Sequence, residues 1–554
     1  MKGLAIDYSV LLPALVPVAG LVLVLVLDLV DPRLRRVPYA VAGLAALGAA
    51  AATVPGLALG GGTTRETFCL TGRGPVAAGA AGSLPSVDGL PQVCLWQADA
   101  LASTLQLAAA LAAAVCIALA WPRTRRTRPS DSTREPVEAV LLLAALAGTI
   151  VVAASRDVGT WLVALELATL PVIALVALSG RRSAVAGATQ LLVTSLVSFA
   201  LLALGVALWF AATGSPFLTP DAALSSGGAF AAGVPGTGSV TVTQAASPVV
   251  YSSVSGGVVA LATVLIVAGV GFKLSLVPFH AWTPTAYAGS SVPVATFLAT
   301  VSKVAALAAL LVVLRSVAVL GTPAVLAIAV LASLSMTLGN VMALRQDDVV
   351  RLLAWSTVAQ AGWVVLPLVS ISALGVGASA TYLLTYVVAT LVAFSVVAVT
   401  LRDQGGRGRS IGDYDGLWRR SPWRAGALVL ALTSLAGLPP GVIGLVGKIT
   451  ALRPVVAEGW IWLAAIAAVN AVIGVAVYLR WLRAVITETS PEPVAAPAPE
   501  APLEPAGATA ASGGEGAPLA MSQRRPLVVA GLMLASAVLV VVSVQPDLLL
   551  RLLG

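Results

Sequence analysis

Long apolar segments recur along the whole of this 554-residue chain. Each is roughly 18 to 28 residues long, enough for a helix to cross a hydrocarbon layer of about 30 Å. Backbone groups inside a bilayer must bond to one another, so such segments form helices. The sequence therefore predicts an all-α, polytopic integral membrane protein with fourteen transmembrane helices. The predicted helices cover residues 8–30, 37–59, 98–121, 137–154, 158–179, 184–212, 252–279, 292–314, 322–344, 349–370, 373–401, 423–452, 459–485 and 526–550.

The composition excludes a soluble protein. Apolar residues make up 58% of the chain and charged residues only 10%, and the mean hydropathy is +0.98. A soluble domain of this length could not hold so much apolar surface away from water. The first segment ends in Asp28, Asp31 and a basic cluster and has no small-residue cleavage site, so we expect a retained helix instead of a removed signal peptide.

The basic residues predict the orientation. With both termini outside, the cytoplasmic loops hold 22 of the 32 Lys and Arg residues, and the outer side holds 7. This is the positive-inside bias of membrane proteins, and it accounts for most of the net charge of +8. The arginines are spread over short loops without interleaved aromatic residues, so no nucleic-acid partner is expected. The predicted cytoplasmic loops are 31–36, 122–136, 180–183, 280–291, 345–351, 402–424 and 480–525.

Two outer cysteines and one long linker complete the organisation outside the helices. Cys69 and Cys94 fall in the predicted outer loop, where they form either a disulfide or two free thiols. Cys116 lies inside the third helix and is expected to be a small core residue. Residues 486–525 are rich in Pro, Ala and Glu, which predicts a flexible cytoplasmic linker before the last helix at 526–554.

Lysine is used sparingly and in unusual places. Of four lysines, three lie in apolar segments: Lys273, Lys303 and Lys448. Arginine stays protonated in proteins, whereas a lysine removed from water can release its proton. The clearest acidic residue far from a predicted helix end is Glu166. These four groups are costly in a bilayer unless they face protein, water or an opposite charge, and one acid cannot neutralise three lysines, so they predict a proton path instead of a purely structural ion pair.

Glycine and proline predict two broken helices. Pro278 closely follows Lys273, and Pro439 and Pro440 precede Lys448, each with several glycines nearby. If helices 4–8 and 9–13 are two inverted five-helix repeats, the broken helices 7 and 12 hold the same place in each, an arrangement typical of transporters. The predicted units are 1–121 (three helices), 122–314 (first repeat), 315–485 (second repeat), 486–525 (linker) and 526–554 (helix 14).

The only histidine, His280, lies where helix 7 should reach the cytoplasm. Its pKa range suits a proton relay at an entrance, although a lone histidine is as often an ordinary polar residue. No second histidine or cysteine cluster accompanies it, so no metal site is expected. Beside Lys303, the hydroxyls of Thr300 and Ser302 either hold a water chain or bond back to the helix backbone.

Several long motifs resemble one family. The run FKLSLVPFHAWTPTAYAGSSVPVATFLATVSKVAAL is similar to the signature of the antiporter-like, proton-translocating membrane subunits of respiratory complex I. Within that group, RQDDVVRLLAWSTVAQAGWVVL, IGDYDGLWRRSP and SLAGLPPGVIGLVGK look most like the subunit N family of NADH-quinone oxidoreductase. The resemblance covers roughly residues 90–485. It implies a proton path through Glu166, Lys273, Lys303 and Lys448.

The chain departs from the family pattern near two of these helices. Thr285 stands where the family commonly has aspartate, and Ala288 and Ser290 replace a frequent Glu-Gly-Ala pattern. Gln360 stands where many relatives have histidine. These changes put in doubt an acidic group at the mouth of helix 7 and a titratable group on helix 10.

The resemblance implies a membrane subunit of the bacterial plasma membrane that couples NADH-to-quinone electron transfer to proton pumping. The chain has no dinucleotide, flavin or iron–sulfur motif, so FMN and iron–sulfur clusters are expected in partner subunits and no cofactor in this chain. The expected partners are neighbouring antiporter-like and small membrane subunits and the lipid bilayer. The alternatives are a subunit of a multi-subunit cation/proton antiporter and a passive membrane scaffold, and the scaffold leaves the lysines unexplained.

Overall fold

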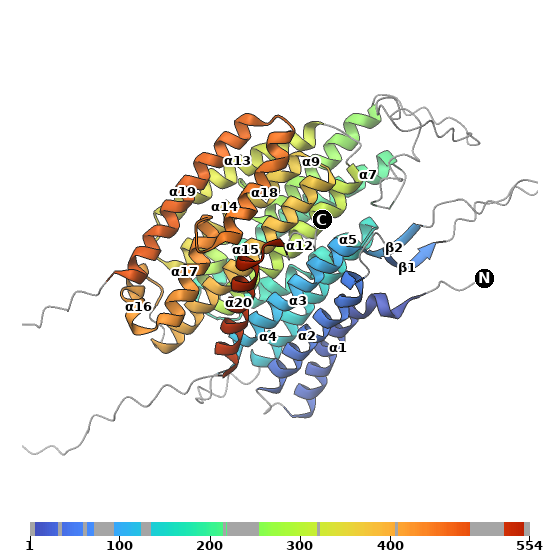
Figure 1. Cartoon of the computed structure of the whole chain (residues 1–554). Coiled ribbons are helices and arrows are strands. Elements are labelled where there is room, and N and C mark those ends of the chain that lie inside the picture. Colours follow the sequence, from blue (N-terminus) through green and yellow to red (C-terminus); the bar gives the residue numbers. More distant parts are fainter. Residues whose placement is uncertain are drawn as a thin grey trace, which may run out of the picture.

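The computed structural model describes residues 6–31, 36–58, 64–70, 93–122, 134–213, 216, 218, 254–317, 322–404, 408–487 and 526–547. They form a bundle of long helices with one small hairpin at its end (Figure 1). Thirteen of the described helical stretches are long and apolar enough to cross a membrane. The fourteenth predicted span, 423–452, consists of two shorter helices separated by a turn. The multi-pass all-α fold is therefore confirmed.

The N-terminal unit and the first repeat run from the blue to the green part of Figure 1. The N-terminal unit contains α1 (Tyr8–Val30), α2 (Val37–Ala58), β1 (Arg65–Leu70), β2 (Val93–Ala98) and α3 (Ala100–Ala120). The first repeat contains α4 (Arg134–Ala154), α5 (Val158–Leu167), α6 (Leu170–Ala177), α7 (Arg182–Thr213), α9 (Val254–Leu274), α10 (Trp282–Gly289), α11 (Val292–Ala299) and α12 (Val301–Val317).

The second repeat and the last helix complete the bundle. They contain α13 (Thr322–Leu344), α14 (Val349–Val365), η2 (Leu366–Val369), α15 (Ala373–Asp403), η3 (Ile411–Tyr414), α16 (Leu417–Arg420), α17 (Pro422–Ala436), α18 (Val442–Ala457), α19 (Ile461–Ile486) and α20 (Pro526–Val544). Helix α20 packs across α15 and α3, which joins the C-terminal end of the chain to the N-terminal unit (Figure 1). The predicted linker at 486–525 lies almost wholly outside the described residues, and the unit boundaries stay predictions.

Three spans form the centre of the bundle. The apolar windows of 292–314, 349–369 and 373–403 are each 94% buried, whereas that of α7 is only 28% buried. A helix buried on all sides cannot face lipid, so α11, α12, α14 and α15 are the inner helices. The polar groups that they carry therefore face protein.

Four transmembrane segments are broken within the described part of the chain, whereas the sequence predicts two. The predicted breaks in helices 7 and 12 are confirmed, because α9 ends at Leu274 and α17 ends at Ala436. Helix 5 is also broken between α5 and α6, and helix 8 between α11 and α12. Pro171, in the first turn of α6, fits the first additional break, because proline has no amide hydrogen to donate to the carbonyl of Leu167 at the end of α5. The predicted loop at 280–291 also needs correction, since it contains the short helix α10.

The contacts between loops fit the predicted topology, in which successive loops alternate between the two ends of the bundle. At the predicted cytoplasmic end, Arg409 forms an ion pair with Asp348 at 3.0 Å and donates to the carbonyl of Ala288. At the opposite end, the hydroxyl of Ser370 donates to Glu458 at 2.8 Å. Each pair joins loops that the topology assigns to one side. Which end faces the cytoplasm stays a prediction.

The hairpin of β1 and β2 is fixed to the predicted outer end of helices 4 and 5. Cys69 and Cys94 are opposite one another in its register and form a disulfide, so this alternative is confirmed. The amide of Arg156 donates to Leu95, and its side chain donates to Gln97. Cys116 is buried, as expected. The hairpin thus packs on the turn between α4 and α5.

This arrangement makes the orientation testable. In whole cells, a membrane-impermeant maleimide should label the chain only after reduction, because reduction frees Cys69 and Cys94 while Cys116 stays buried. A Cys69→Ser, Cys94→Ser variant is the control and should remain unlabelled. Labelling that requires opened membranes, with reduction confirmed, would reverse the assigned orientation.

Candidate functional site

The end of α9 shows how the first break is made. Ser275 follows the helix in the left-handed conformation, at φ 68°. The amide of Leu276 donates back to Gly271 at 2.8 Å, and that of Ser275 to Phe272 at 3.0 Å, which is the Schellman pattern of helix ends. The amide of Val277 donates to the hydroxyl of Ser335 on α13. Protein groups therefore satisfy this non-helical backbone at membrane depth.

Lys303 binds this helix end. Its ammonium donates to the carbonyl of Lys273 at 2.9 Å and to the hydroxyl of Ser275 at 2.6 Å. The Nζ atom also lies 4.9 Å from the centre of the Trp282 ring, a cation–π contact. The last carbonyls of a helix carry partial negative charge and lack partners within the helix. The helix end thus gives the ammonium a favourable environment without a carboxylate.

The side chain of Lys273 points to helix 5. Its Nζ lies 2.9 Å from Oε1 of Glu166 and 2.8 Å from the hydroxyl of Thr169. The side chains of Lys273 and Glu166 are only 5% and 15% exposed, so this is a buried ion pair. Glu166 and Thr169 lie on either side of the break between α5 and α6. The two broken helices therefore meet at their breaks, and Glu166, Lys273 and Lys303 form one contiguous polar line.

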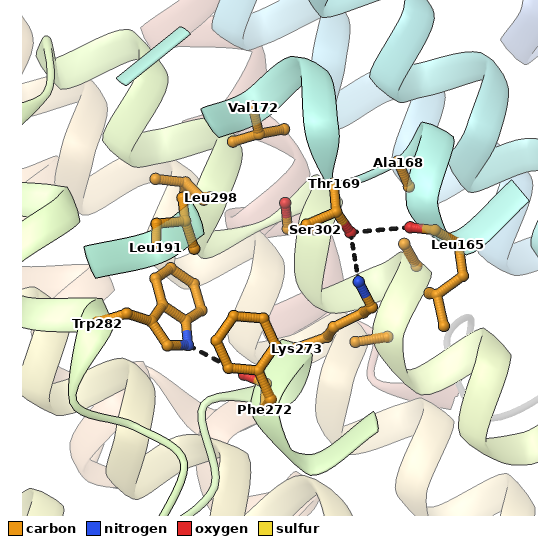
Figure 2. A pocket seen from close by; sticks show the side chains of 12 residues that line it. Leu165, Ala168, Thr169, Val172, Leu191, Phe272, Lys273, Trp282, Leu298 and Ser302 are labelled. Carbon is orange, nitrogen blue, oxygen red and sulfur yellow. Dashed lines mark hydrogen bonds between the residues drawn. The ribbon is translucent and has the colours of Figure 1, made fainter. Parts of the chain in front are cut away.

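A small cavity lies beside this line. It has a volume of about 20 Å³, which is enough for about one water molecule. Figure 2 shows Lys273 and Thr169 bonded to each other at its wall, with Ser302 close by and the Trp282 indole bonded to the backbone of Phe272. The hydroxyl of Thr300 instead bonds back to Thr296 on its own helix. Of the two hydroxyls next to Lys303, only that of Ser302 is therefore available to the cavity.

The second break repeats the design of the first. Gly437 follows α17 in the left-handed conformation at φ 79°, and the amide of Leu438 donates back to Thr433 at 2.9 Å. Lys448, from α18, donates to the carbonyl of Ala436 at 2.5 Å. Its Nζ lies 5.4 Å from the centre of the Trp363 ring. An ammonium again binds a helix end and faces an indole.

By its contacts, Lys303 and not Lys273 is the counterpart of Lys448. Each of these two lysines binds the end of a broken helix and faces an indole ring. Lys303 and Lys448 are 2% and 6% exposed, and neither has an ion-pair partner among the described residues. A helix end stabilises an ammonium through partial charges and supplies no full counter-charge. Lys273 differs from these two lysines because it forms an ion pair with a carboxylate, that of Glu166. Thr169, Trp282 and Trp363 were missed by sequence reasoning because their residue types are common in membrane helices.

His280 lies between α9 and α10. It is beside α14, which is the tenth predicted transmembrane helix. Its ring centre is 5.3 Å from that of Trp355, and its Nδ1 has no hydrogen-bond partner within the described part of the chain. Burial lowers the pKa of His280 below its ordinary value, so the neutral imidazole prevails at neutral pH. The histidine is at the predicted cytoplasmic end, as expected, but makes no direct bond to the lysines.

Comparison with known proteins gives the family. The family model described as NADH:quinone oxidoreductase/Mrp antiporter, TM, matches residues 155–474, more than half of the chain. NADH-quinone oxidoreductase subunit N of Salinispora tropica is 36% identical over 497 residues, which cover 88% of this chain and 86% of that protein. These matches confirm the resemblance that the motifs indicated.

Solved structures share the whole architecture. A chain of respiratory complex I from Thermus thermophilus with bound aureothin has a TM-score of 0.68 at 27% identity, and the match covers 97% of this chain and 98% of that chain. A chain of the Mrp complex from Dietzia sp. has a TM-score of 0.72 at 22% identity over 99% and 96% of the two chains, which shows a common fold. Length, motifs and fold agree, and the chain belongs to the subunit N family of NADH-quinone oxidoreductase, one of the antiporter-like membrane families.

Proposed function

We propose that the chain is a proton-translocating membrane subunit of NADH-quinone oxidoreductase and that Glu166, Lys273, Lys303 and Lys448 carry the protons. The observation that carries this proposal is a polar line among apolar helices, in which Lys273 bonds Glu166 through its ammonium and Lys303 bonds the main-chain carbonyl of Lys273. Each ammonium can release a proton and take another, and the small cavity supports a water molecule beside the line. His280 is the proposed relay at the cytoplasmic entrance.

The Glu166 pair gives the line a switch. When the Lys273 ammonium stays on Glu166, the pair holds the proton in place. A shift that turns the Lys273 side chain from Glu166 toward Lys303 separates the charges and favours transfer of the proton, and the helix break directly after Leu274 gives the backbone there freedom to move. Lys448, at the second break, then holds the proton in the exit half of the path.

The proposal assigns the redox chemistry to partner subunits. FMN and iron–sulfur clusters are expected there, and no cofactor or metal ion is expected in this chain. The expected neighbours are the other antiporter-like and small membrane subunits of the complex, in the plasma membrane of a bacterium with both chain termini outside. The relatives named subunit N, which align over most of the chain, support this assembly over a cation/proton antiporter.

Deletion and complementation of the gene test the proposal. In inverted membrane vesicles, deletion should abolish most NADH-driven proton uptake, and the intact chain on a plasmid should restore it. An affinity-tagged chain should copurify with flavin and iron–sulfur absorbance. Copurification with small membrane subunits alone, together with sodium/proton exchange that is independent of NADH, would favour the antiporter alternative and reject the proposal.

A further inference from the structure

Arg156 is a buried charged residue at the turn between α4 and α5, and the proposed proton path does not use it. It is 6% exposed, its guanidinium donates to Gln97 at 2.9 Å, and the same group lies 3.8 Å from the carboxylate of Asp99. Gln97 belongs to β2, and Asp99 caps the start of α3. A charge removed from water is costly unless it is paired and hydrogen-bonded, so a buried arginine at this turn requires an explanation.

The hairpin also holds the main chain at Arg156. The amide of Arg156 donates to the carbonyl of Leu95 at 2.9 Å, and Ser155 forms an antiparallel β-bridge with Trp96. Side chain and backbone of Arg156 are therefore bound to the same strand, β2. The turn that precedes α5 follows the hairpin wherever the hairpin is held.

Two cross-links hold the hairpin in its own shape. The disulfide joins Cys69 on β1 to Cys94 on β2. The side-chain amide of Gln97 donates to the carboxylate of Glu66 on β1 at 2.8 Å, while its carbonyl oxygen accepts from Arg156. A two-stranded hairpin is only marginally stable alone in water, so these links decide whether it keeps its shape. We call the hairpin of β1 and β2 together with Arg156 the clasp.

The clasp determines where α5 begins. Asp157, directly after Arg156, caps this helix, and its carboxylate accepts from a backbone amide of the first turn at 2.7 Å. At a rise of about 1.5 Å per residue, Glu166 lies about 15 Å further along, next to the break. One face of α5 is open, since Val163 is 70% exposed, so side-by-side packing alone does not fix the helix. A shift of its first turn would move Glu166 relative to Lys273.

A second polar contact acts on the same end of α5. The indole of Trp161 donates to the carbonyl of Ala309 on α12 at 3.2 Å, one turn after the clasp. Both contacts hold the first turn of α5, whereas the Glu166 end meets Lys273. The helix is therefore held at one end and carries its charged group at the other.

We propose that Arg156 is a positioning residue for the ion pair of Glu166 and Lys273, and that the disulfide-closed hairpin holds Arg156 in place; this rests on the proton-translocating function proposed above. The clasp fixes the first turn of α5, and the helix keeps the carboxylate at its far end within hydrogen-bonding reach of Lys273. Arg156 itself carries no transferred proton, because arginine stays protonated in proteins.

The test is a double-variant cycle in vesicles with equal amounts of assembled complex. Arg156→Gln should lower NADH-driven proton uptake about tenfold, because a group displaced by about 1 Å can cost up to ~10²-fold in rate. If Arg156 acts through Glu166, the double variant Arg156→Gln, Glu166→Gln should pump no worse than Glu166→Gln alone. An independent structural role would make the two losses multiply, and that result would reject the proposal.

Two single variants complete this experiment. Arg156→Lys should retain much of the proton uptake, because an ammonium still offers Asp99 a counter-charge and Gln97 a donor. Arg65→Gln is the matched control, since Arg65 lies on the same hairpin but donates to Ser9 on α1. It should pump normally, and a loss as large as that of Arg156→Gln would reject a specific role of Arg156.

A variant without the disulfide keeps the proposal falsifiable if Arg156→Gln assembles poorly. In assembled Cys69→Ser, Cys94→Ser complexes, the amides in the first turn of α5 should exchange faster with deuterium, and proton uptake should fall. Unchanged exchange together with unchanged uptake would reject the clasp. If Glu166→Gln pumps normally, the proposed role of Glu166 itself fails; if Glu166→Gln is impaired while both clasp variants pump normally, only the clasp fails.

Discussion

Lys448→Arg should impair coupled turnover about as strongly as Lys448→Ala, by about 10²-fold if Lys448 carries the transferred proton. Arginine can still donate to the carbonyl of Ala436, so the charge and the bond survive. What it cannot do is release its proton. The measurement is NADH-driven proton uptake in vesicles with equal amounts of assembled complex, and near-normal pumping by the arginine variant would exclude Lys448 as a proton carrier.

Further variants test whether the larger side chain of arginine, and not its fixed proton, causes the loss of pumping in Lys448→Arg. Lys448 packs closely against Gly437, where an added Cβ would lie 3.0 Å from the lysine chain, so a larger head group could disturb the break. Arg453→Lys, an exposed position on the same helix, should leave pumping unchanged. Lys303→Arg provides an independent site of the same design. Loss of pumping in both lysine variants, with intact assembly, would assign the effect to the proton and not to volume.

Glu166→Gln should leave an assembled complex with its electron-transfer cofactors but with strongly reduced turnover linked to pumping. Glutamine is nearly the same shape and can still accept from Lys273, but it no longer offers the ammonium a counter-charge. If the ion pair served stability alone, the substitution would weaken assembly, since an unpaired buried charge costs about 3 to 5 kcal/mol. Native gels and vesicle assays on the same preparation separate the two outcomes.

Two further variants sharpen the result. Glu166→Asp should retain part of the activity, because the charge remains while the reach shortens by about 1.5 Å, one carbon–carbon bond. Glu66→Gln, on the β1–β2 hairpin, is the matched control and should behave as the wild type. Unchanged assembly and unchanged pumping in Glu166→Gln would rule out both the switch and the structural pair.

Much of the fold and of the charged site could be predicted, because in a membrane protein the length of apolar segments and the position of charges follow directly from the cost of placing polar groups in lipid. Segment length gave the spans, and charge on an apolar background gave Glu166 and the three lysines. Proline and glycine gave the breaks after α9 and α17. Charge on an apolar background singled out both Lys273 and Glu166, and the structure shows that they form an ion pair at 2.9 Å.

Three features could not be predicted, for different physical reasons. The break after Ala299 has no proline or glycine at its turn, so tertiary contacts such as the hydrogen bond from Tyr386 to the carbonyl of Ala299 select it. The equivalence of Lys303 and Lys448 is set by how the chain folds around each break, which their neighbours in sequence do not reveal. The hydrogen bonds that Gln360 makes with Tyr382 and Tyr478 join residue types that occur everywhere in membrane helices, so only the packing of the helices reveals them. The break at Thr169 is different, since Pro171 offered a usable signal.

The partners of Lys303 and Lys448 have a consequence for how this protein can be studied. Each of the two lysines donates to a main-chain carbonyl, of Lys273 or of Ala436, which every amino acid carries. An alanine scan will therefore remove the lysine and tryptophan side chains but leave these main-chain acceptors in place. An alignment of sequences cannot reveal the acceptors either, because a carbonyl is present whatever the side chain is. Only changes that move the helix end itself, such as a different residue in place of the left-handed Gly437, can reach these acceptors.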